Sequence, residues 1–379
     1  MRLLIASKNA LDPRLGAPQT LIALGRALED LGHAVDYVDP PILGTDEAGF
    51  PGALRAHLDR HAADYDVVDY DYRSLPAPRA SLPQDVLLVA RIQLLPAGLD
   101  GLRWPPLPRL SSRIGALLQR RRRAARRTAA AAEDDARLRE SDLVVILNTR
   151  DRARLIERGH PPEKVVVIAN GLGSEVADAL DAVPAEVPPG PPRVAFVGMY
   201  GPRKGGGDFP RIVARLAERV PEVRVRLIGT AGMLETADAV KRMFPRRLRD
   251  RLEVVPRYRR DELAGLLAPC WAGVFPSYHE GFMLAVLEML AAALPVVAYD
   301  APGASDALPP ERLIPPGDTD AIAARLAALL NDPAKLAEAR RAARAAAAPY
   351  RWPTVAAQTA AVYEDALARR RAPLQPMLP

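Results

Sequence analysis

The stretch FPSYHEGFMLAVLEML, residues 275–290, joins a polar loop to a strongly apolar segment. Glu280 lies just before a predicted helix that Gly281 opens, and the N-terminus of a helix offers unpaired N–H groups and a partial positive charge. The helix is apolar on nearly every face, so we expect it to be buried. Glu288 is its only charged residue. Because a carboxylate is almost never buried without a partner, Glu288 requires one.

The spacing of the two glutamates separates their roles. Glu280 and Glu288 are eight positions apart, which is about 12 Å along a helix. The paired carboxylates of a glycosidase lie only ~5–9.5 Å apart, so the spacing favours two anchors on one long ligand over an acid–base pair. The partner of Glu288 is then either a pair of ligand hydroxyls or a structural arginine or backbone group.

Short β-rich runs alternate with helical patterns along the rest of the chain. Continuous apolar runs are typical of strands buried on both faces of a parallel sheet. The predicted strands are residues 2–7, 33–38, 66–70, 86–91, 142–147 and 164–169 in a first series, and 193–198, 223–229, 252–256, 272–277 and 295–300 in a second. The predicted tail helices are residues 321–330, 333–348 and 354–371. Two such series indicate an α/β protein with two doubly wound, Rossmann-like domains facing each other across a cleft.

A Pro-rich segment separates the two series. AVPAEVPPGPPR, residues 182–193, has five Pro and almost no apolar periodicity, so it predicts an interdomain linker. We therefore expect a first domain over residues 1–182, a linker at 183–192, a second domain over 193–349, and a C-terminal helical segment over 350–379.

Ligands of parallel sheets bind beyond the carboxyl ends of the strands, so the loops there are the candidate sites. After the strand at 193–198 comes MYGPRKGGGDF, in which Arg203 and Lys204 stand among glycines. Exposed backbone N–H groups and cations both favour a diphosphate, although an ordinary solvated turn remains the alternative. In the first series, Gly16 and Ala17 precede the helix that starts near Gln19, where backbone donors would also reach a ligand.

The sequence offers little for a metal. Asp64-x-Asp66 and Asp69-x-Asp71 are D-x-D pairs, a device of metal-dependent glycosyltransferases, but this pattern is common by chance. The five histidines lack zinc-ligand spacing, and a G-x-S-x-G nucleophile elbow is absent. We expect neither a metal nor a cofactor.

Composition narrows the cellular setting. Cys270 is the single cysteine, which fits a reducing compartment such as the cytosol, and no signal peptide is evident after MRLLIAS. The net charge is +6, and residues 103–127 hold nine Arg and no acidic residue. This segment is either a solvated helix face or a surface for anionic lipid at the inner side of the membrane or for a phosphate-bearing acceptor. Because it lacks interleaved aromatics apart from Trp104 at its start, we expect no nucleic-acid partner.

With these residues in view, the chain resembles the retaining GT-B glycosyltransferases of family four, the glycosyl transferases of group 1. PSYHEGFMLAVLEMLAAALPVVA is similar to the donor-site motif of that family at Glu280, Gly281, Phe282 and Glu288. FVGMYGPRKG and VRLIGTAG are similar to its glycine-rich turn and next strand, and LGAPQTLIALGRALEDLGHAV to its first loop and helix.

The resemblance implies a role for each candidate residue. Lys204 and Arg203 would meet the diphosphate of a nucleotide sugar, Glu280 the hydroxyls of the transferred sugar, and Glu288 the ribose hydroxyls. Glu280 and Lys204 are the predicted catalytic residues. The remaining predicted donor contacts are the backbone at Gly281, Phe282, Met283 and Leu284 and, from the first domain, Gly16 and Ala17.

The implied function is a retaining, metal-independent transfer of a hexosyl group from a UDP- or GDP-sugar to a saccharide, lipid-linked or small-molecule acceptor. Such enzymes serve cell-envelope or polysaccharide biosynthesis in the cytoplasm, and their C-terminal helix returns to the first domain. The chain departs from the family at Met199, where an Arg is usual, at Met283, and at Arg91, where the first domain often has His. Arg91 is the predicted acceptor-side residue. A sugar phosphorylase on the same fold and a non-catalytic nucleotide-sugar-binding protein are the alternatives.

Overall fold

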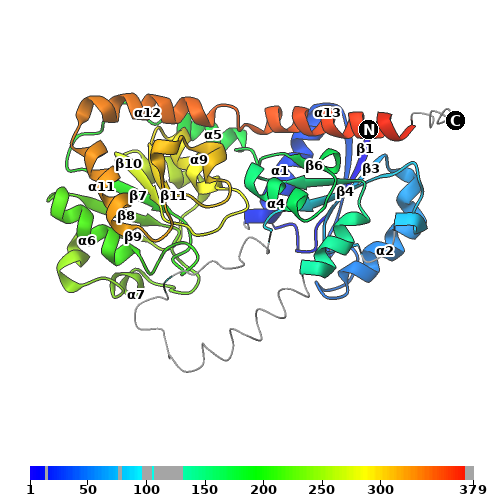
Figure 1. Ribbon diagram of the computed structural model, residues 1–379, viewed down its shortest axis with the longest axis horizontal. Helices are drawn as coiled ribbons and strands as arrows, with labels where there is room; N and C mark the ends of the chain where they lie inside the picture. The colour runs from blue at the N-terminus through cyan, green and yellow to red at the C-terminus, as the bar shows by residue number, and fades with distance from the viewer. Residues whose placement is uncertain (13–15, 76–78, 96–104, 106–130, 372–379) are drawn as a thin grey trace, which may run out of the picture. The chain divides into compact units, whose positions relative to one another are not determined.

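The structure is a computed structural model that describes the chain except residues 13–15, 76–78, 96–104, 106–130 and 372–379 (Figure 1). Contacts divide the chain into two units. The first contains the described residues up to 95, those from 131 to 171, and residues 352–371, whereas the second contains residues 172–351. The chain thus leaves the first unit after Gly171 and returns to it at Trp352.

The first unit is built on a six-stranded parallel sheet with the order β2-β1-β3-β4-β5-β6. Its strands are β1 (Arg2–Ala6), β2 (Ala34–Val38), β3 (Val67–Asp71), β4 (Leu87–Ile92), β5 (Leu143–Ile146) and β6 (Val165–Val167). Its described helices are α1 (Gly16–Asp30), α2 (Phe50–His61), α4 (Thr149–Glu157) and α13 (Trp352–Arg371), and residues 131–139 are also helical. Ile5 of β1 pairs with Tyr37 on one side and Asp69 on the other, so β1 is flanked by β2 and β3.

The second unit has its own six-stranded parallel sheet, with the order β12-β11-β10-β7-β8-β9. Its strands are β7 (Arg193–Val197), β8 (Arg224–Ile228), β9 (Leu252–Val255), β10 (Ala272–Phe275), β11 (Val296–Tyr299) and β12 (Leu313–Ile314). Its helices are α5 (Ser174–Asp181), α6 (Phe209–Arg219), α7 (Ala237–Lys241), α8 (Leu263–Leu267), α9 (Leu284–Ala291), α10 (Ala304–Ala307), α11 (Thr319–Leu330) and α12 (Pro333–Ala347). The expected α/β fold with two parallel sheets is confirmed. All eleven predicted strands form, and only the two-residue β12 was too short to be recognised from its sequence.

The boundaries between the units differ from the expected ones. The second unit begins at Leu172, before the expected limit at residue 182, because α5 packs against α8 and α9. The Pro-rich segment 183–192 therefore lies inside the second unit and joins α5 to β7. Arg340 of α12, which is fully buried, donates hydrogen bonds to the carbonyl oxygens of Pro184 and Ala185. Proline lacks an N–H but keeps its carbonyl, so Arg340 fixes this segment by donating to its backbone carbonyl oxygens.

The C-terminal helix α13 belongs to the first unit, where it packs against α1 (Figure 1). It also reaches the sheet through a buried polar cluster. The Arg91 guanidinium donates to both carboxylate oxygens of Asp69, and the Tyr363 hydroxyl of α13 donates to Asp69 Oδ2 at 2.6 Å. Arg91 also lies 2.9 Å from the Tyr363 hydroxyl oxygen. Asp69 and Arg91 are almost fully buried, so each charge needs a partner, and the ion pair between them provides it.

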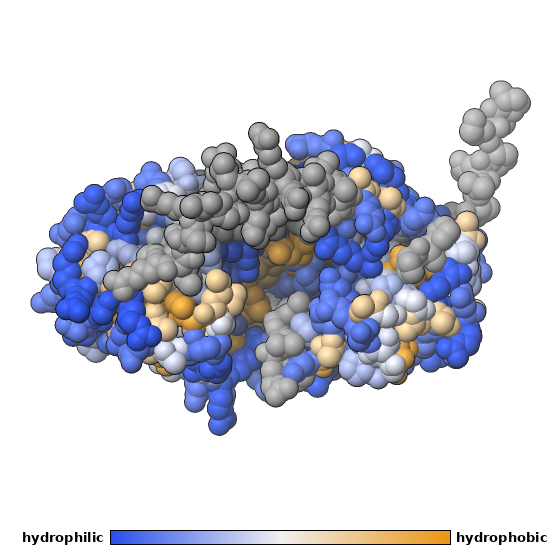
Figure 2. All heavy atoms as spheres, turned by 90° about the horizontal axis from the view of Figure 1, so that it is seen from below, coloured by the Kyte–Doolittle hydropathy of each residue, from blue (hydrophilic) through white to orange (hydrophobic). Residues whose placement is uncertain are grey.

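The surface is mainly hydrophilic on the face drawn in Figure 2. Few large apolar side chains are exposed among the described residues: Leu31, Ile42, Met199 and Met233. None of the described helices is both long enough and apolar enough to cross a bilayer. The apolar run at 281–299 instead forms α9 and β11 inside the second unit. The basic segment at 103–127 lies outside the described residues apart from Pro105.

Removal of the Asp69 carboxylate tests the buried cluster of the first unit. The substitution Asp69→Ala leaves the buried Arg91 charge unpaired, so we expect it to lower the free energy of unfolding by about 3–5 kcal/mol. Chemical denaturation of the full chain measures this loss. The matched control is Asp59→Ala, because Asp59 pairs with Arg55 on the exposed face of α2 and should cost at most about 1 kcal/mol. Equal losses in the two variants would contradict the assignment.

Candidate functional site

Two loops of the second unit meet where the strand order of its sheet reverses. From β7 the chain builds outward through β8 and β9, and it then returns to place β10 on the other side of β7. In doubly wound sheets, ligands bind at such a switch point, beyond the carboxyl ends of the two strands. The loop after β7 carries Arg203 and Lys204, and the loop after β10 carries Ser277 and Glu280. The structure therefore brings the predicted diphosphate and sugar residues together.

Glu280 is the centre of this arrangement. Its side chain is only 8% exposed, and one carboxylate oxygen, Oε1, receives three donors. Lys204 Nζ lies at 2.7 Å, Arg203 Nη1 at 2.9 Å, and the Ser277 hydroxyl also donates to it. No described residue donates to the second oxygen, Oε2. Glu280 thus has a free acceptor for a hydroxyl, and Lys204, which has three N–H donors, keeps capacity for an anion.

The two loops are tied together by further contacts. The Tyr278 amide donates to the Arg203 carbonyl at 2.9 Å, and the Tyr278 hydroxyl donates to Asp208 Oδ2 at 2.5 Å. Gly205 has a φ of +77°, and a Cβ there would lie 2.2 Å from the carbonyl oxygen of Pro276. Only glycine allows this approach. The distance between Lys204 and Glu280 is therefore set by main-chain packing as well as by charge.

Glu288 lies on α9 and is equally buried, with its side chain 8% exposed. Its described ion pair is with Arg260 of the segment between β9 and α8, where Nη2 lies 3.4 Å from Oε1. This separation is long for a charge-assisted hydrogen bond. The arginine alternative for the partner of Glu288 is therefore present in the structure, but it satisfies only one oxygen and only weakly.

The two glutamates differ in ionisation. Burial acts to raise the pKa of Glu280, but the charges of Lys204 and Arg203 and their hydrogen bonds outweigh it, so that pKa falls below its ordinary value. Burial raises the pKa of Glu288 to about 7, because the opposing charges of Arg260 and Lys204 are not enough. Near neutral pH, Glu280 is a carboxylate, whereas Glu288 gains or loses its proton readily.

The helix begins later than the sequence suggested. Gly281 does not open α9, which starts at Leu284 with Met283 as its N-cap. The 12 Å helical spacing between the glutamates therefore does not apply, because Glu280 lies in the loop. The N–H groups of Phe282, Met283 and Leu284 donate to no described residue. They sit at the positive end of α9, where an anion is favoured.

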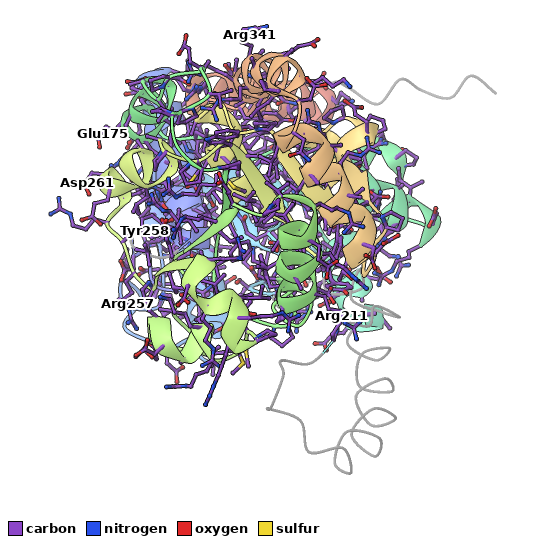
Figure 3. The ribbon with its side chains drawn as sticks, turned by 90° about the vertical axis from the view of Figure 1, so that its left-hand side faces the viewer. Glu175, Arg211, Arg257, Tyr258, Asp261 and Arg341 are labelled. Atoms are coloured by element: carbon purple, nitrogen blue, oxygen red, sulfur yellow. The ribbon has the colours of Figure 1, made fainter. Side chains whose placement is uncertain are left out.

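Several contributors at this site carry no recognisable sequence signal. Asp208 accepts from Tyr278 and also from the Tyr299 hydroxyl at 3.0 Å, so a buried carboxylate anchors both aromatic rings beneath the loops. Tyr258 lies close to Glu288 on the segment after β9, where Arg257 and Asp261 project outward (Figure 3). A tyrosine two or three positions after a strand is unremarkable in a sequence, and only the fold places it here.

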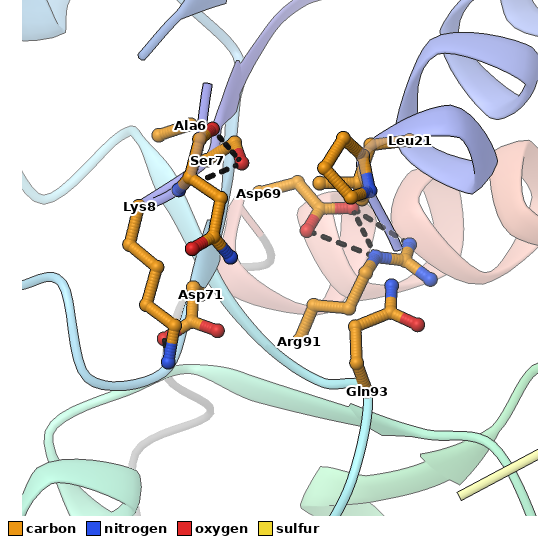
Figure 4. A pocket seen from close by; sticks show the side chains of 10 residues that line it. Ala6, Ser7, Lys8, Leu21, Asp69, Asp71, Arg91 and Gln93 are labelled. Carbon is orange, nitrogen blue, oxygen red and sulfur yellow. Dashed lines mark hydrogen bonds and ion pairs between the residues drawn. The ribbon is translucent and has the colours of Figure 1, made fainter. Parts of the chain in front are cut away.

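Of the first-unit candidates, Gly16 and Ala17 are the first residues of α1. Arg91 pairs with Asp69 and lines a hollow to which Pro18 of α1 also contributes (Figure 4). Each of the four D-x-D aspartates lies next to a basic side chain: Asp64 to His61, Asp66 to Arg371, Asp69 to Arg91 and Asp71 to Lys8. No group of three or more His, Cys, Asp or Glu suited to a metal occurs in the described part of the chain.

Comparison with known proteins finds a family match over part of the chain. Residues 191–332 match the family model described as Glycosyl transferases group 1. The chain is 32% identical over 244 residues to the D-inositol 3-phosphate glycosyltransferase of Thermobispora bispora, an alignment that covers 59% of this chain and 56% of that protein. The chain thus spans a little over half the length of such relatives.

Solved structures agree over nearly the whole chain. The sucrose-phosphate synthase of Thermosynechococcus elongatus superposes with a TM-score of 0.71 and 20% identity, covering 97% of this chain and 100% of that one. HepE of Anabaena, solved in complex with UDP-glucose, superposes with a TM-score of 0.67 and 19% identity, covering 96% of this chain and 100% of that one. The fold of the chain is GT-B, and its segment 191–332 matches the family model of the group 1 glycosyltransferases, as the sequence motifs indicated.

The raised pKa of Glu288 predicts a pH-dependent cost to stability. Between about pH 4.5 and 7 the folded chain keeps the Glu288 proton and the unfolded chain loses it, so stability falls as pH rises through this window. The substitution Glu288→Gln removes this fall. We expect the free energy of unfolding of the variant, measured relative to that of the unmodified chain, to be higher at pH 8 than at pH 5 by on the order of 3 kcal/mol. Denaturant unfolding at the two pH values measures the change.

The control for this measurement is Glu218→Gln, because Glu218 is exposed on α6. That variant should show the same stability difference from the unmodified chain at both pH values. A Glu288→Gln variant with an unchanged difference between pH 5 and pH 8 would show that Glu288 is ionised across the whole range.

Proposed function

We propose that this chain transfers a glycosyl group from a nucleoside-diphosphate sugar to a hydroxyl-bearing acceptor, with retention of anomeric configuration and without a metal. The observation that carries the proposal is the buried Glu280 carboxylate, which has two cations on one oxygen and an open second oxygen. A site that combines cations, unpaired helix N–H groups and a carboxylate acceptor matches a ligand with both phosphate and sugar hydroxyls.

The diphosphate is proposed to bind between the glycine-rich loop and α9. Lys204 and Arg203 supply positive charge from one side, and the N–H groups of Phe282, Met283 and Leu284 supply donors from the other. Lys204 Nζ lies over the ring of Phe275, 4.8 Å from its centroid, and the lysine side chain is 15% exposed. Its charge is therefore held in place and shielded from water, which strengthens its attraction to phosphate.

The two glutamates are proposed to hold the two sugars of the donor. Glu280 Oε2 accepts a hydroxyl of the transferred sugar, and Glu288 accepts the ribose hydroxyls. The high pKa of Glu288 supports this role, because it shows a carboxyl whose protein partners are insufficient. Two hydroxyl donors from a ribose would complete its hydrogen bonding and favour its ionised form.

The proposed transfer needs no covalent nucleophile. The bond between the anomeric carbon and the β-phosphate oxygen breaks, and its electron pair stays on the diphosphate. The acceptor oxygen forms its bond to the anomeric carbon on the same face, and its proton passes to the departing phosphate oxygen. Lys204, Arg203 and the α9 N–H groups stabilise the charge that develops on the diphosphate, which is commonly the largest catalytic contribution.

The relatives support the donor class. HepE was solved with UDP-glucose, and the Thermobispora relative bears the name of a glycosyltransferase that acts on an inositol phosphate. In this chain Met199, which is 41% exposed, follows β7 where the family has an arginine. Arg203 is proposed to take over part of that charge, because its guanidinium reaches Glu280 from the same loop. A cytosolic setting accords with Cys270, a buried thiol with no partner cysteine.

A thermal-shift screen identifies the donor. The full chain is heated with UDP, GDP, ADP and their sugar conjugates, each in large excess. A ligand at about 100 times its dissociation constant stabilises the folded chain by about 2.7 kcal/mol, so the correct nucleotide should raise the melting temperature by several degrees. An unchanged melting temperature with every nucleotide would contradict the proposal, and an increase with inorganic phosphate alone would favour a phosphorylase.

The residue roles are tested by transfer assays with the donor so identified. We expect Glu280→Gln and Lys204→Ala each to lower turnover by about 100-fold, because each removes charge that acts on the reacting ligand. The matched control is Lys241→Ala, because Lys241 ends α7 and belongs to neither of the two loops, so this variant should keep full activity. Undiminished transfer by both site variants would overturn the assignment.

A further inference from the structure

The second unit has a strongly basic segment at the edge of its sheet opposite the donor loops. Residues 241–251 read KRMFPRRLRDR and contain six basic residues and one acidic residue. The 3₁₀ helix η5 (Arg246–Arg251) ends directly before β9, so it lies at the amino ends of the parallel strands. Lys204 and Glu280 follow the carboxyl ends of β7 and β10. A five-residue strand such as β8 separates the two edges by roughly 16 Å, so this segment is not part of the donor site.

Several arginines at this edge are held in place without being neutralised. Arg249 and Arg251 of η5 and Arg224 at the start of β8 each donate to main-chain carbonyl oxygens. None of the three forms an ion pair with a described carboxylate. By contrast, Arg226 of the same strand as Arg224 pairs with Glu253 at 2.6 Å. A carbonyl contact fixes a guanidinium but leaves its positive charge available to an anion.

The other cations of the segment are open to solvent. Arg242, Arg246 and Arg247 are exposed, and Lys241 is partly exposed. These four also lack an ion pair with any acidic side chain that the structure describes. Neighbouring cations without acidic partners repel one another, so an anionic partner would relieve this repulsion.

Part of this edge is concave. Arg224, Arg247 and Arg251 line an open pocket with an empty volume of about 990 Å³, at the upper end of the range of roughly 300–1,000 Å³ that is usual for small-ligand sites. Glu222 and Asp250 line the same pocket, and both are exposed. The lining therefore combines guanidinium donors for an anionic group with carboxylates that accept from hydroxyl groups.

The large apolar side chains of the segment do not face solvent. Phe244 and Leu248 are buried, and Met243 packs against the same core. Peripheral binding to a bilayer draws on buried apolar area as well as on charge, and these residues supply none. A flat bilayer surface would also leave the pocket unfilled. The segment therefore suits a water-soluble polyanion better than a membrane.

Two features disfavour a nucleic acid as that polyanion. Phe244 is the only aromatic residue of the segment, and its burial leaves no ring for stacking with bases. Glu222 and Asp250 would face a closely spaced row of phosphates, which they repel. A chain of sugars that carries anionic groups only at intervals reduces this repulsion, and its hydroxyls can donate to the two carboxylates.

We propose that the basic surface, defined as residues 241–251 with Arg224, binds an anionic glycan, a chain of sugars that carries carboxylate or phosphate groups. The arginines pair with the anionic groups, and Glu222 and Asp250 accept from the hydroxyls between them. The proposal rests on the proposed glycosyl transfer, because an enzyme that extends saccharides has such a chain as substrate or product. It assigns to the second unit a holding surface that is separate from the donor loops.

Binding of a panel of polymers by the full chain tests the proposal. The probes are hyaluronate, polygalacturonate, a phosphorylated mannan, neutral dextran, duplex DNA, and vesicles of phosphatidylglycerol and phosphatidylcholine, all at one ionic strength. We expect at least one anionic glycan to bind more tightly than dextran, DNA and vesicles, with an affinity that falls as salt screens the charges. Tighter binding of DNA, binding of the vesicles alone, or no binding of any anionic glycan would overturn the proposal.

A double substitution locates the binding. Because Arg246 and Arg247 are exposed, the changes Arg246→Gln and Arg247→Gln together should leave the melting temperature of the free chain unaltered. We expect them to weaken binding of the anionic glycan by about 10-fold or more, since two charge-assisted contacts are lost.

The matched control removes the same charge elsewhere in the second unit. It carries Arg211→Gln and Arg341→Gln, exposed positions on α6 and α12 that Figure 3 labels. This control should weaken the glycan by at most about two-fold, because only the long-range field changes. Equal weakening by the two double variants would show that the glycan responds to net charge alone and would overturn the proposal.

Nucleotide binding separates this inference from the proposed function. The variant with Arg246→Gln and Arg247→Gln should respond to UDP or GDP in the thermal-shift screen as the unmodified chain does. If a nucleotide raises the melting temperature but no anionic glycan binds, the basic surface is refuted and the proposed function stands. If a glycan binds through Arg246 and Arg247 while no nucleotide raises the melting temperature, the proposed function fails and the basic surface stands.

Discussion

The second unit depends on the burial of one negative charge, that of Glu280. A carboxylate this enclosed cannot remain ionised unless cations are supplied, and the loop after β7 supplies Lys204 and Arg203. Because Glu280 follows β10, the ion pairs also fix two loops that meet at the reversal of strand order. The approach of Gly205 to Pro276 and the bond between Tyr278 and Asp208 then hold the main chains at that separation.

Both units have a switch point in their parallel sheets, but the residues near the two switch points differ in charge. In each sheet the polar residues gather beyond the strands that flank the switch point. The second unit presents cations and helix N–H groups, which suit an anion, whereas at the switch point of the first unit the described charged residues are paired, Lys8 with Asp71 and Arg91 with Asp69.

Much of the fold could be predicted from the sequence, because buried parallel strands leave continuous apolar runs and all eleven predicted strands formed. Glu280, Lys204 and Glu288 were also recognisable, since each is a charge set among glycines or apolar residues. The sequence could not place the boundary at Leu172, because it depends on the packing of α5 against α8 and α9. It also could not reveal Asp208 or Arg260, whose partners lie tens of residues away and meet them only in the folded chain.

In the proposed complex, Lys204 binds the second phosphate of a nucleotide donor. The most direct measurement is a cycle of binding constants, obtained by calorimetry, for UDP and UMP, or for GDP and GMP, with the unmodified chain and with Lys204→Met. We expect the substitution to weaken binding of the diphosphate at least 10-fold more than binding of the monophosphate, because only the diphosphate reaches Nζ. Equal losses for both nucleotides would contradict it, since Lys204 would then act on the fold of the loops rather than on the phosphate.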